Sequence, residues 1–184
     1  MPLPSAMDEE FYCASRKHIL DFLRTLPLED GSLRILEIGP KLEWPTFETL
    51  DVDAGNHPTH VADITRHTGL PDSHYDLILC ISVLEHVLDP VGALAEIRRL
   101  LKPGGLLAAQ TPLNFRIHGP ANDCWRFTEH GIKVLMKDWD ELNISILESH
   151  SRPLFPIAYA WTARANKEKS IPLESVAKTF RWIE

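Results

Sequence analysis

Residues 75–112 restrict the possible fold more than any other part of the sequence. The apolar run 75–82 has the composition of a strand buried on both faces of a parallel sheet. Asp89 and Pro90 then indicate a helix start, because aspartate caps the first turn and proline suits the first helical position. The helix is expected to end at a Lys-Pro-Gly-Gly sequence, before a second strand at 106–110. We therefore predict two parallel strands joined by a helix.

Shorter segments on both sides continue the alternation of helix and strand. The predicted helices are 9–26, 128–137 and 171–182, and the further predicted strands are 33–38, 47–53, 59–64, 143–148 and 157–163. This order is typical of an α/β protein, and we predict a Rossmann-like, doubly wound, mainly parallel sheet with an antiparallel C-terminal strand. Only eleven residues separate Gly39 from Asp51, so the first crossover helix is expected to be shortened or absent.

The length of 184 residues is that of one domain. We predict a single domain over 1–184. Within it, residues 1–30 would form an N-terminal helix or lid, 31–165 the core, and 166–184 a C-terminal tail or helix. The longest apolar runs are shorter than the ~18 residues that a membrane span requires. The start of the chain is acidic and contains proline, unlike a secretory signal.

The charge of the chain argues against a polyanionic partner. Lys and Arg total 19 and Asp and Glu total 26, which gives a net charge of −7. Residues 41–90 alone hold nine acidic and two basic residues, which also sum to −7. Nucleic acid is therefore disfavoured as a partner. The three cysteines show no paired spacing, and we expect reduced thiols and a cytoplasmic protein without a membrane segment.

Four sequence blocks occur in an informative order: Leu36-Glu-Ile-Gly39, Leu50-Asp-Val-Asp53, Val61-Ala-Asp-Ile64 and the run 75–112. Together they resemble the class I S-adenosylmethionine-dependent methyltransferases, in particular the small-molecule group called type 11. The resemblance covers about residues 34–128. It implies S-adenosylmethionine as the cofactor, and methyl transfer to an oxygen or nitrogen atom of a small molecule or sugar. We also predict that the chain beyond residue 150 can contribute to a homodimer interface.

The resemblance assigns cofactor contacts to the ends of the first two strands. Glu37 and Gly39 would lie under the methionine part of the cofactor, where a glycine lets the backbone approach and a carboxylate can face the ammonium group. Asp51 and Asp53 both end the second strand, and one of them would accept the ribose hydroxyls. Alignment with the family favours Asp51.

Two further strand ends complete the expected cofactor site. By the resemblance, Asp63 would lie near the adenine amino group, with Ile64 as an apolar contact. The end of the fourth strand would lie against the cofactor with Cys80, Ile81 and Ser82.

The first turn departs from the family pattern. Gly39 is followed by Pro-Lys-Leu-Glu-Trp-Pro in place of several glycines. A nicotinamide dinucleotide is disfavoured by this loss, because its pyrophosphate needs a glycine-rich turn at a helix N-terminus. The same departure leaves open an alternative function, a catalytically inactive, methyltransferase-like protein that binds or regulates a partner.

Three side chains are candidates for a base that deprotonates the acceptor. His86 follows the fourth strand, whereas His118 and Asp123 lie in the loop after the fifth. The two histidines are ranked equally and Asp123 behind them. Arg126, in the same loop, could bind an anionic group of the acceptor or pair internally with an acid.

Metal-assisted transfer is a further alternative. Some relatives that methylate catechols or RNA ribose carry Glu-x-x-Glu-His after the fourth strand and a later His, which together bind a divalent ion. The corresponding residues here are Ser82, Glu85, His86 and Asp123, so the first carboxylate is replaced by a hydroxyl. Because the remaining ligands suit Mg²⁺ or Mn²⁺ only weakly, we predict no metal site.

Overall fold

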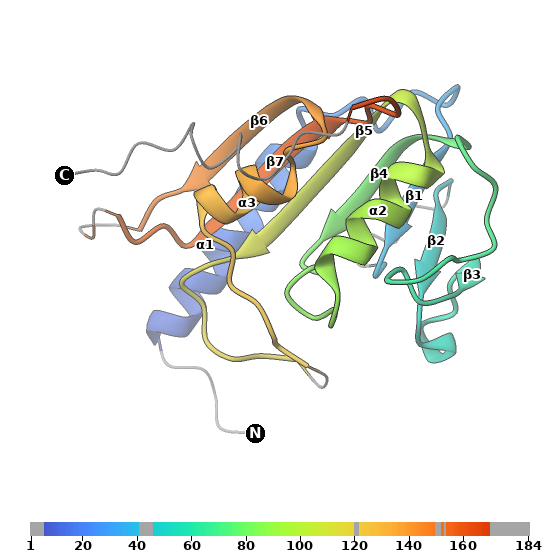
Figure 1. The fold of residues 1–184 in the computed structure, drawn as a ribbon. Helices are drawn as coiled ribbons and strands as arrows, with labels where there is room; N and C mark the ends of the chain where they lie inside the picture. The colour runs from blue at the N-terminus through green and yellow to red at the C-terminus, as the bar shows by residue number, and fades with distance from the viewer. Residues whose placement is uncertain (1–5, 41–45, 120–121, 150–151, 153, 170–184) are drawn as a thin grey trace.

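The computed structural model describes residues 6–40, 46–119, 122–149, 152 and 154–169. One seven-stranded sheet has the strand order β3-β2-β1-β4-β5-β7-β6 (Figure 1). The strands are β1 (Ile35–Ile38), β2 (Glu48–Asp51), β3 (His60–Val61), β4 (Tyr75–Ile81), β5 (Leu101–Pro112), β6 (Asp140–Leu147) and β7 (Ala158–Arg164). β1 to β5 pair in parallel, and β7 runs antiparallel to β5 and β6. The predicted mainly parallel sheet with an antiparallel C-terminal strand is confirmed.

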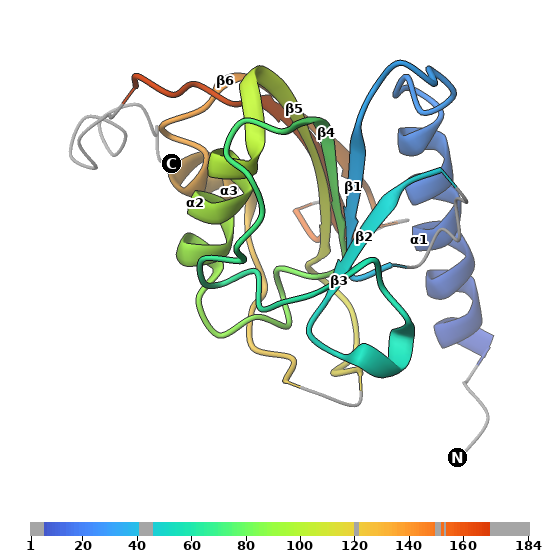
Figure 2. The same cartoon turned by 90° about the vertical axis from the view of Figure 1, so that its right-hand side faces the viewer.

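Helices cover both faces of this sheet. The α-helices are α1 (Ala6–Leu23), α2 (Pro90–Leu100) and α3 (Glu129–Leu135). A short 3₁₀ helix, η1 (Ala54–Asn56), lies in the connection between β2 and β3. α1 lies on one face, whereas α2 and α3 lie on the other (Figure 2). Alternate side chains of β4 pack on opposite faces of the sheet. Ile78 and Cys80 belong to the core on the α2 side, and Leu77 and Leu79 belong to the core on the α1 side.

The strand–helix–strand unit predicted from residues 75–112 is present, with one difference. The Asp89 carboxylate accepts a hydrogen bond from the Gly92 N–H at 2.8 Å, and α2 starts at Pro90 as expected. β5 then begins directly at Leu101, so the predicted turn at 102–105 lies inside the strand. Tyr75 pairs with Leu101 and Leu77 with residue 106, which shows that the extra residues bulge out of the ladder.

Several other bounds differ from those predicted. α1 spans 6–23 and not 9–26, since the residue before Pro27 is disfavoured in a helix. β3 contains only two residues of the predicted strand 59–64. The predicted helix at 171–182 and most of the predicted tail lie outside the described residues. No helix in the described part of the chain has the length and apolar character that crossing a bilayer would need.

The connections near β1, β2 and β3 are short. Nine residues, 39–47, join β1 to β2, fewer than the ~10–12 of a helical crossover, and 41–45 among them are not described. The described residues of this connection are not helical. The predicted shortening or absence of the crossover helix also concerns residues 41–45, which lie outside the described residues. The connection 62–74, which is described throughout, also contains no helix between β3 and β4.

A buried ion pair fastens the connection 62–74 to α2. Glu96 is 7% exposed and accepts hydrogen bonds from the Thr68 N–H at 2.8 Å and the Thr68 hydroxyl at 2.7 Å. Arg99 donates to both Glu96 oxygens, to the Leu70 carbonyl at 2.8 Å and to Asp72. Side-chain hydrogen bonds to Glu96 and Arg99 therefore hold the connection 62–74, which contains no helix, against α2.

Candidate functional site

A cavity of about 740 Å³ opens where β1, β2 and β4 end. This is the edge of a doubly wound sheet at which ligands bind, and the volume is that of a small-molecule or cofactor site. Of the residues predicted from the sequence, those that line the cavity are Gly39, Asp51, Asp63, Ile64, Ser82, His86 and His118. The apolar part of the lining includes Leu50, Val83, Val87 and Leu88.

The turn after β1 requires its glycine. Gly39 has a φ of +64°, and a Cβ at this position would lie 2.7 Å from the Val83 side chain. Ser82, at the end of β4, also has a positive φ, +52°. Its hydroxyl donates to the Gln110 side-chain oxygen at 2.7 Å, and its N–H donates to the Gln110 carbonyl at 2.9 Å. Strained backbone of this kind, held by neighbours, is typical of binding sites.

Asp51 and Asp53 have different surroundings. The Asp51 carboxylate accepts from the Asp53 N–H at 2.9 Å and from the Asn56 amide at 2.8 Å, and Asp51 lines the cavity. Asp53 accepts from the Gly55 N–H at 2.8 Å and caps η1. Asp53 is not among the described residues that line the cavity. The geometry thus supports the prediction that favours Asp51 for ligand contact.

Asp63 follows β3, the neighbour of β2 in the sheet, and lines the cavity with a charged carboxylate. It accepts hydrogen bonds from the Thr65 hydroxyl at 2.7 Å and the Thr65 N–H at 2.9 Å, and these bonds hold the pKa of Asp63 below its ordinary value. Arg66 lies 3.5 Å away but is mostly exposed. The neighbouring Ile64 is 5% exposed and contributes an apolar wall.

Three other predicted residues lie in the sheet behind the cavity. Glu37 is 1% exposed within β1, and Cys80 and Ile81 are buried in the two cores. These three do not belong to the described cavity lining. For Cys80 and Ile81, the continuous apolar run of β4 in the sequence could have predicted this burial. A strand covered on both faces directs its side chains into the cores and not beyond its end.

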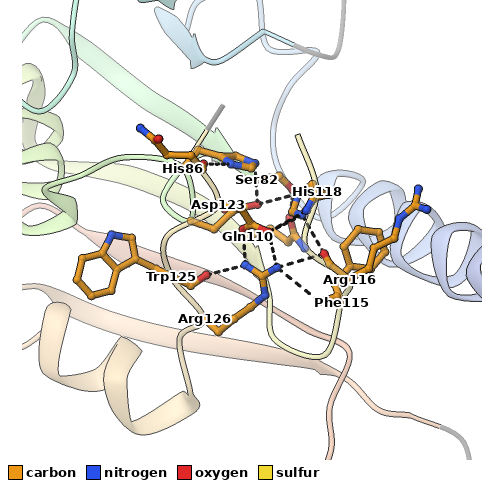
Figure 3. A network of polar contacts seen from close by, with 11 residues as sticks. Ser82, His86, Gln110, Phe115, Arg116, His118, Asp123, Trp125 and Arg126 are labelled. Atoms are coloured by element: carbon orange, nitrogen blue, oxygen red, sulfur yellow. Dashed lines mark hydrogen bonds and ion pairs between the residues drawn. The ribbon is translucent and has the colours of Figure 1, made fainter. Parts of the chain in front are cut away.

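His86 and His118 follow β4 and β5, on the other side of β1 from Asp51 and Asp63, and both line the cavity. Figure 3 shows them in one network of polar contacts. Their ring centroids are 4.9 Å apart. The His86 Nδ1 lies 2.7 Å from the Asn122 carbonyl oxygen, and the His118 Nδ1 lies 3.3 Å from an Asp123 carboxylate oxygen. Both Nε2 atoms are near the buried Glu85 carboxylate, at 3.8 Å from His86 and 4.0 Å from His118.

Asp123 is engaged in an ion pair and does not line this cavity. Its side chain is 3% exposed, and each carboxylate oxygen accepts from one nitrogen of the Arg126 guanidinium. These bonds hold the pKa of Asp123 well below its usual range. Arg126 also donates to the carbonyls of Arg116 and Trp125, at 3.2 and 2.9 Å. Of the two predicted roles for Arg126, internal pairing is the one observed.

One group of side chains has the geometry of metal ligands. One atom each from Glu85, His86 and His118 can be chosen so that all lie within 4.8 Å of one another. This set differs from the one weighed from the sequence, because the Ser82 hydroxyl bonds to Gln110 and Asp123 pairs with Arg126. The third ligand in the structure is His118, from the loop after β5.

The sequence comparisons match the middle of the chain. Residues 45–109 match a protein family described as "Methyltransferase domain". Over 79 residues the chain is 37% identical to proteins named ubiquinone biosynthesis O-methyltransferase from Yersinia pestis (strain Pestoides F) and Yersinia pseudotuberculosis serotype O:1b (strain IP 31758). The aligned part covers 43% of this chain and spans about a quarter, 26%, of those relatives.

Solved structures match most of the chain. A possible histamine N-methyltransferase from Thermotoga maritima aligns with a TM-score of 0.62 and 17% identity, covering 86% of this chain and 94% of its own. A methyltransferase dependent on S-adenosylmethionine from Archaeoglobus fulgidus aligns with a TM-score of 0.60 and 16% identity, over 86% and 97%. A [4+2]-cyclase aligns with a TM-score of 0.58 and 14% identity, over 88% and 82%. The likeness therefore shows the fold, on which different reactions occur.

Proposed function

We propose that the chain is a class I S-adenosylmethionine-dependent methyltransferase and that it transfers a methyl group to an oxygen atom of a small molecule. The observation that carries the proposal is the division of the cavity. The carboxylates of Asp51 and Asp63 line it where β2 and β3 end, and the imidazoles of His86 and His118 line it after β4 and β5, on the other side of β1. Oxygen is favoured as the attacking atom because the curated relatives are named O-methyltransferases.

The cavity fits S-adenosylmethionine in charge and in hydrogen-bonding capacity. Among the described residues, the lining includes the carboxylates of Asp51, Asp63 and Asp89 and a single arginine, Arg66, which suits a ligand with a sulfonium and an ammonium group. An ionised carboxylate has about four acceptor sites, so Asp51 can take ribose hydroxyls in addition to its two internal bonds. When bound, the cofactor supplies an electrophilic methyl group.

Gly39, Asp51, Asp63 and Ile64 would hold this cofactor, with Ser82 at the strand end between them and the histidines. In support of this, all five are among the residues that line the cavity. Cofactor contacts of Glu37, Asp53, Cys80 and Ile81 stay predictions.

His118 is the proposed base for the acceptor hydroxyl. Burial lowers the pKa of its imidazole below the ordinary value of 6.5, although the negative charge of Asp123 opposes this shift. His118 is therefore neutral near pH 7 and can take a proton. The carboxylate of Asp123 would stabilise the imidazolium that forms. His86 has only a backbone carbonyl at its Nδ1, which ranks it second.

The lowered pKa predicts the pH dependence of the reaction. The base must be deprotonated, so kcat/KM should rise with pH and level off once the pH exceeds the His118 pKa, which lies below 6.5. Initial rates with labelled S-adenosylmethionine, measured from pH 5 to 9 on phenols and catechols, test this. A rate that rises only above pH 8 would contradict a histidine base.

Replacing Asp51 with alanine should weaken binding of S-adenosylhomocysteine about 10- to 100-fold, because a charge-assisted hydrogen bond contributes about 1.5–3 kcal/mol. Asp53→Ala is the matched control. It removes only the η1 cap and should change the Kd less than fivefold. Calorimetry on both variants measures the effect, with circular dichroism to verify the fold. A larger loss for Asp53→Ala would reverse the assignment of the two acids.

A divalent cation at Glu85, His86 and His118 is the second candidate for activating the acceptor, favoured by the convergence of their ligand atoms. Methyl transfer that survives EDTA supports the base. Transfer lost with EDTA and restored by Mg²⁺, Mn²⁺ or Zn²⁺ supports the metal. Cofactor binding without transfer to any phenol, catechol, sugar or amine tested would favour the inactive, regulatory alternative.

Small molecules are the proposed acceptors, in keeping with the chain's acidic charge of −7. The homodimer, the weak affinity for nucleic acid and the cytoplasmic location stay predictions.

A further inference from the structure

We propose that Asp123 and Arg126 form a positioning pair that fixes the ring orientation and the tautomer of His118. The inference rests on the proposed function, in which His118 takes a proton from the acceptor. Asp123 is thereby removed from the list of bases and acts only through His118. Figure 3 shows the three side chains in one network of polar contacts.

The surroundings of the His118 Nδ1 determine the tautomer. This atom lies 3.3 Å from an Asp123 carboxylate oxygen and 3.3 Å from the Arg116 carbonyl oxygen. Both neighbours are acceptors, so the single proton of the neutral ring belongs on Nδ1. The Nε2, 4.0 Å from the Glu85 carboxylate, is left with the lone pair that can accept a proton.

One carboxylate oxygen holds both the ring and the backbone of His118. The Asp123 Oδ2 that faces the ring also accepts a hydrogen bond from the His118 N–H at 2.9 Å. The bond to the backbone fixes the position of Oδ2 relative to the main chain of His118. A rotation of the ring about its side-chain bonds would therefore break the Nδ1 contact.

Arg126 holds this carboxylate in place and keeps it ionised. Its guanidinium binds both Asp123 oxygens and donates to the Phe115 and Arg116 carbonyls, at 3.5 and 3.2 Å. It therefore joins the segment before His118 to the segment around residue 123. An aspartate bound in this forked way is a poor proton acceptor, but its charge still favours a protonated imidazole beside it.

Among the described residues, four charged or titratable side chains surround His118. Asp123 and Arg126 flank its Nδ1 side, and Glu85 and His86 lie on its Nε2 side.

Long-range ¹H–¹⁵N spectra of the full chain measure the tautomer of His118 directly. The wild type should show the Nδ1–H tautomer. In Asp123→Asn, the side-chain amide can donate to the ring, so the Nε2–H population should grow. The control is Asp21→Asn, which removes an exposed aspartate whose arginine partner, Arg24, is also three residues later. It should leave the His118 signals unchanged.

Methyl transfer and cofactor binding complete the test. Asp123→Asn should lower kcat at least tenfold and leave the Kd for S-adenosylhomocysteine within twofold of the wild type. An Nε2–H tautomer in the wild type would overturn the proposal, and so would His118 signals in Asp123→Asn that match those of the control. If Asp123→Asn does not fold, the wild-type tautomer still decides. Failure of the wild type to bind S-adenosylhomocysteine would instead remove the proposed function.

Discussion

Replacing His118 with asparagine is expected to lower kcat about 10²–10⁴-fold, the usual contribution of a general base. The Kd for S-adenosylhomocysteine should stay within twofold of the wild type, because His118 follows β5, which β1 and β4 separate from the strands that carry Asp51 and Asp63. Single-turnover rates with a saturating phenol or catechol, together with calorimetry, separate the two effects. A large change in Kd with an unchanged kcat would place His118 in the cofactor site.

Two histidine variants give this experiment its controls. His67→Asn replaces an exposed imidazole that only accepts from the Gly69 N–H at 3.1 Å, and it should retain full activity. His86→Asn should cost less activity than His118→Asn, since the His86 Nδ1 contacts a neutral carbonyl in place of a carboxylate. A greater loss in His86→Asn would transfer the role of base to His86.

Replacing Glu96 with alanine should lower the free energy of unfolding by about 3–5 kcal/mol, because it leaves the Arg99 guanidinium without its buried partner. The loss corresponds to a fall in Tm of roughly 6–20 °C for a chain of this size. Thermal unfolding followed by circular dichroism measures it. Glu141→Gln, which breaks an exposed pair with Arg164, should cost less than about 1 kcal/mol.

The same side chain predicts how stability depends on pH. Burial alone would raise the pKa of Glu96, but hydrogen bonds from Arg99 and Thr68 lower it to about 2, from an ordinary value of 4.5. A depressed pKa stabilises the fold above pH 4.5, and this contribution is lost as the pH falls toward 2. Wild-type Tm should therefore fall more steeply than that of Glu96→Gln in this range. Parallel curves would show that Glu96 is not held as an ion.

The part of the fold that the sequence predicts best is the unit 75–112, because local signals there agree with one another. The apolar run of β4, the Asp89 cap and the Pro-Gly-Gly sequence each act within a few residues. β3 was predicted too long because its two paired residues depend on β2, whose position no local signal determines. The bulge at 102–105 likewise depends on the register with β4.

The candidate site was predictable in its residue types but not in its pairings. His86 and His118 are 32 residues apart in sequence, and only the folded loop brings their rings to 4.9 Å. That loop is held by Asp123 and Arg126, whose spacing of three residues carries no signal for an ion pair outside a helix. Sequence reasoning therefore named the histidines, ranked Asp123 behind them as a base, and left open whether Arg126 pairs with an acid of the chain.

Two short strands, β2 and β3, form the wall next to the proposed adenosyl group. β2 has four residues and β3 has two, and β3 is joined to the sheet by a two-residue register. Few main-chain bonds must break for this edge to open, so it should exchange its amide protons before the central strands do. A ligand that bridges Asp51 and Asp63 would close this edge. Cofactor affinity should consequently decrease on warming well below the temperature at which the whole domain unfolds.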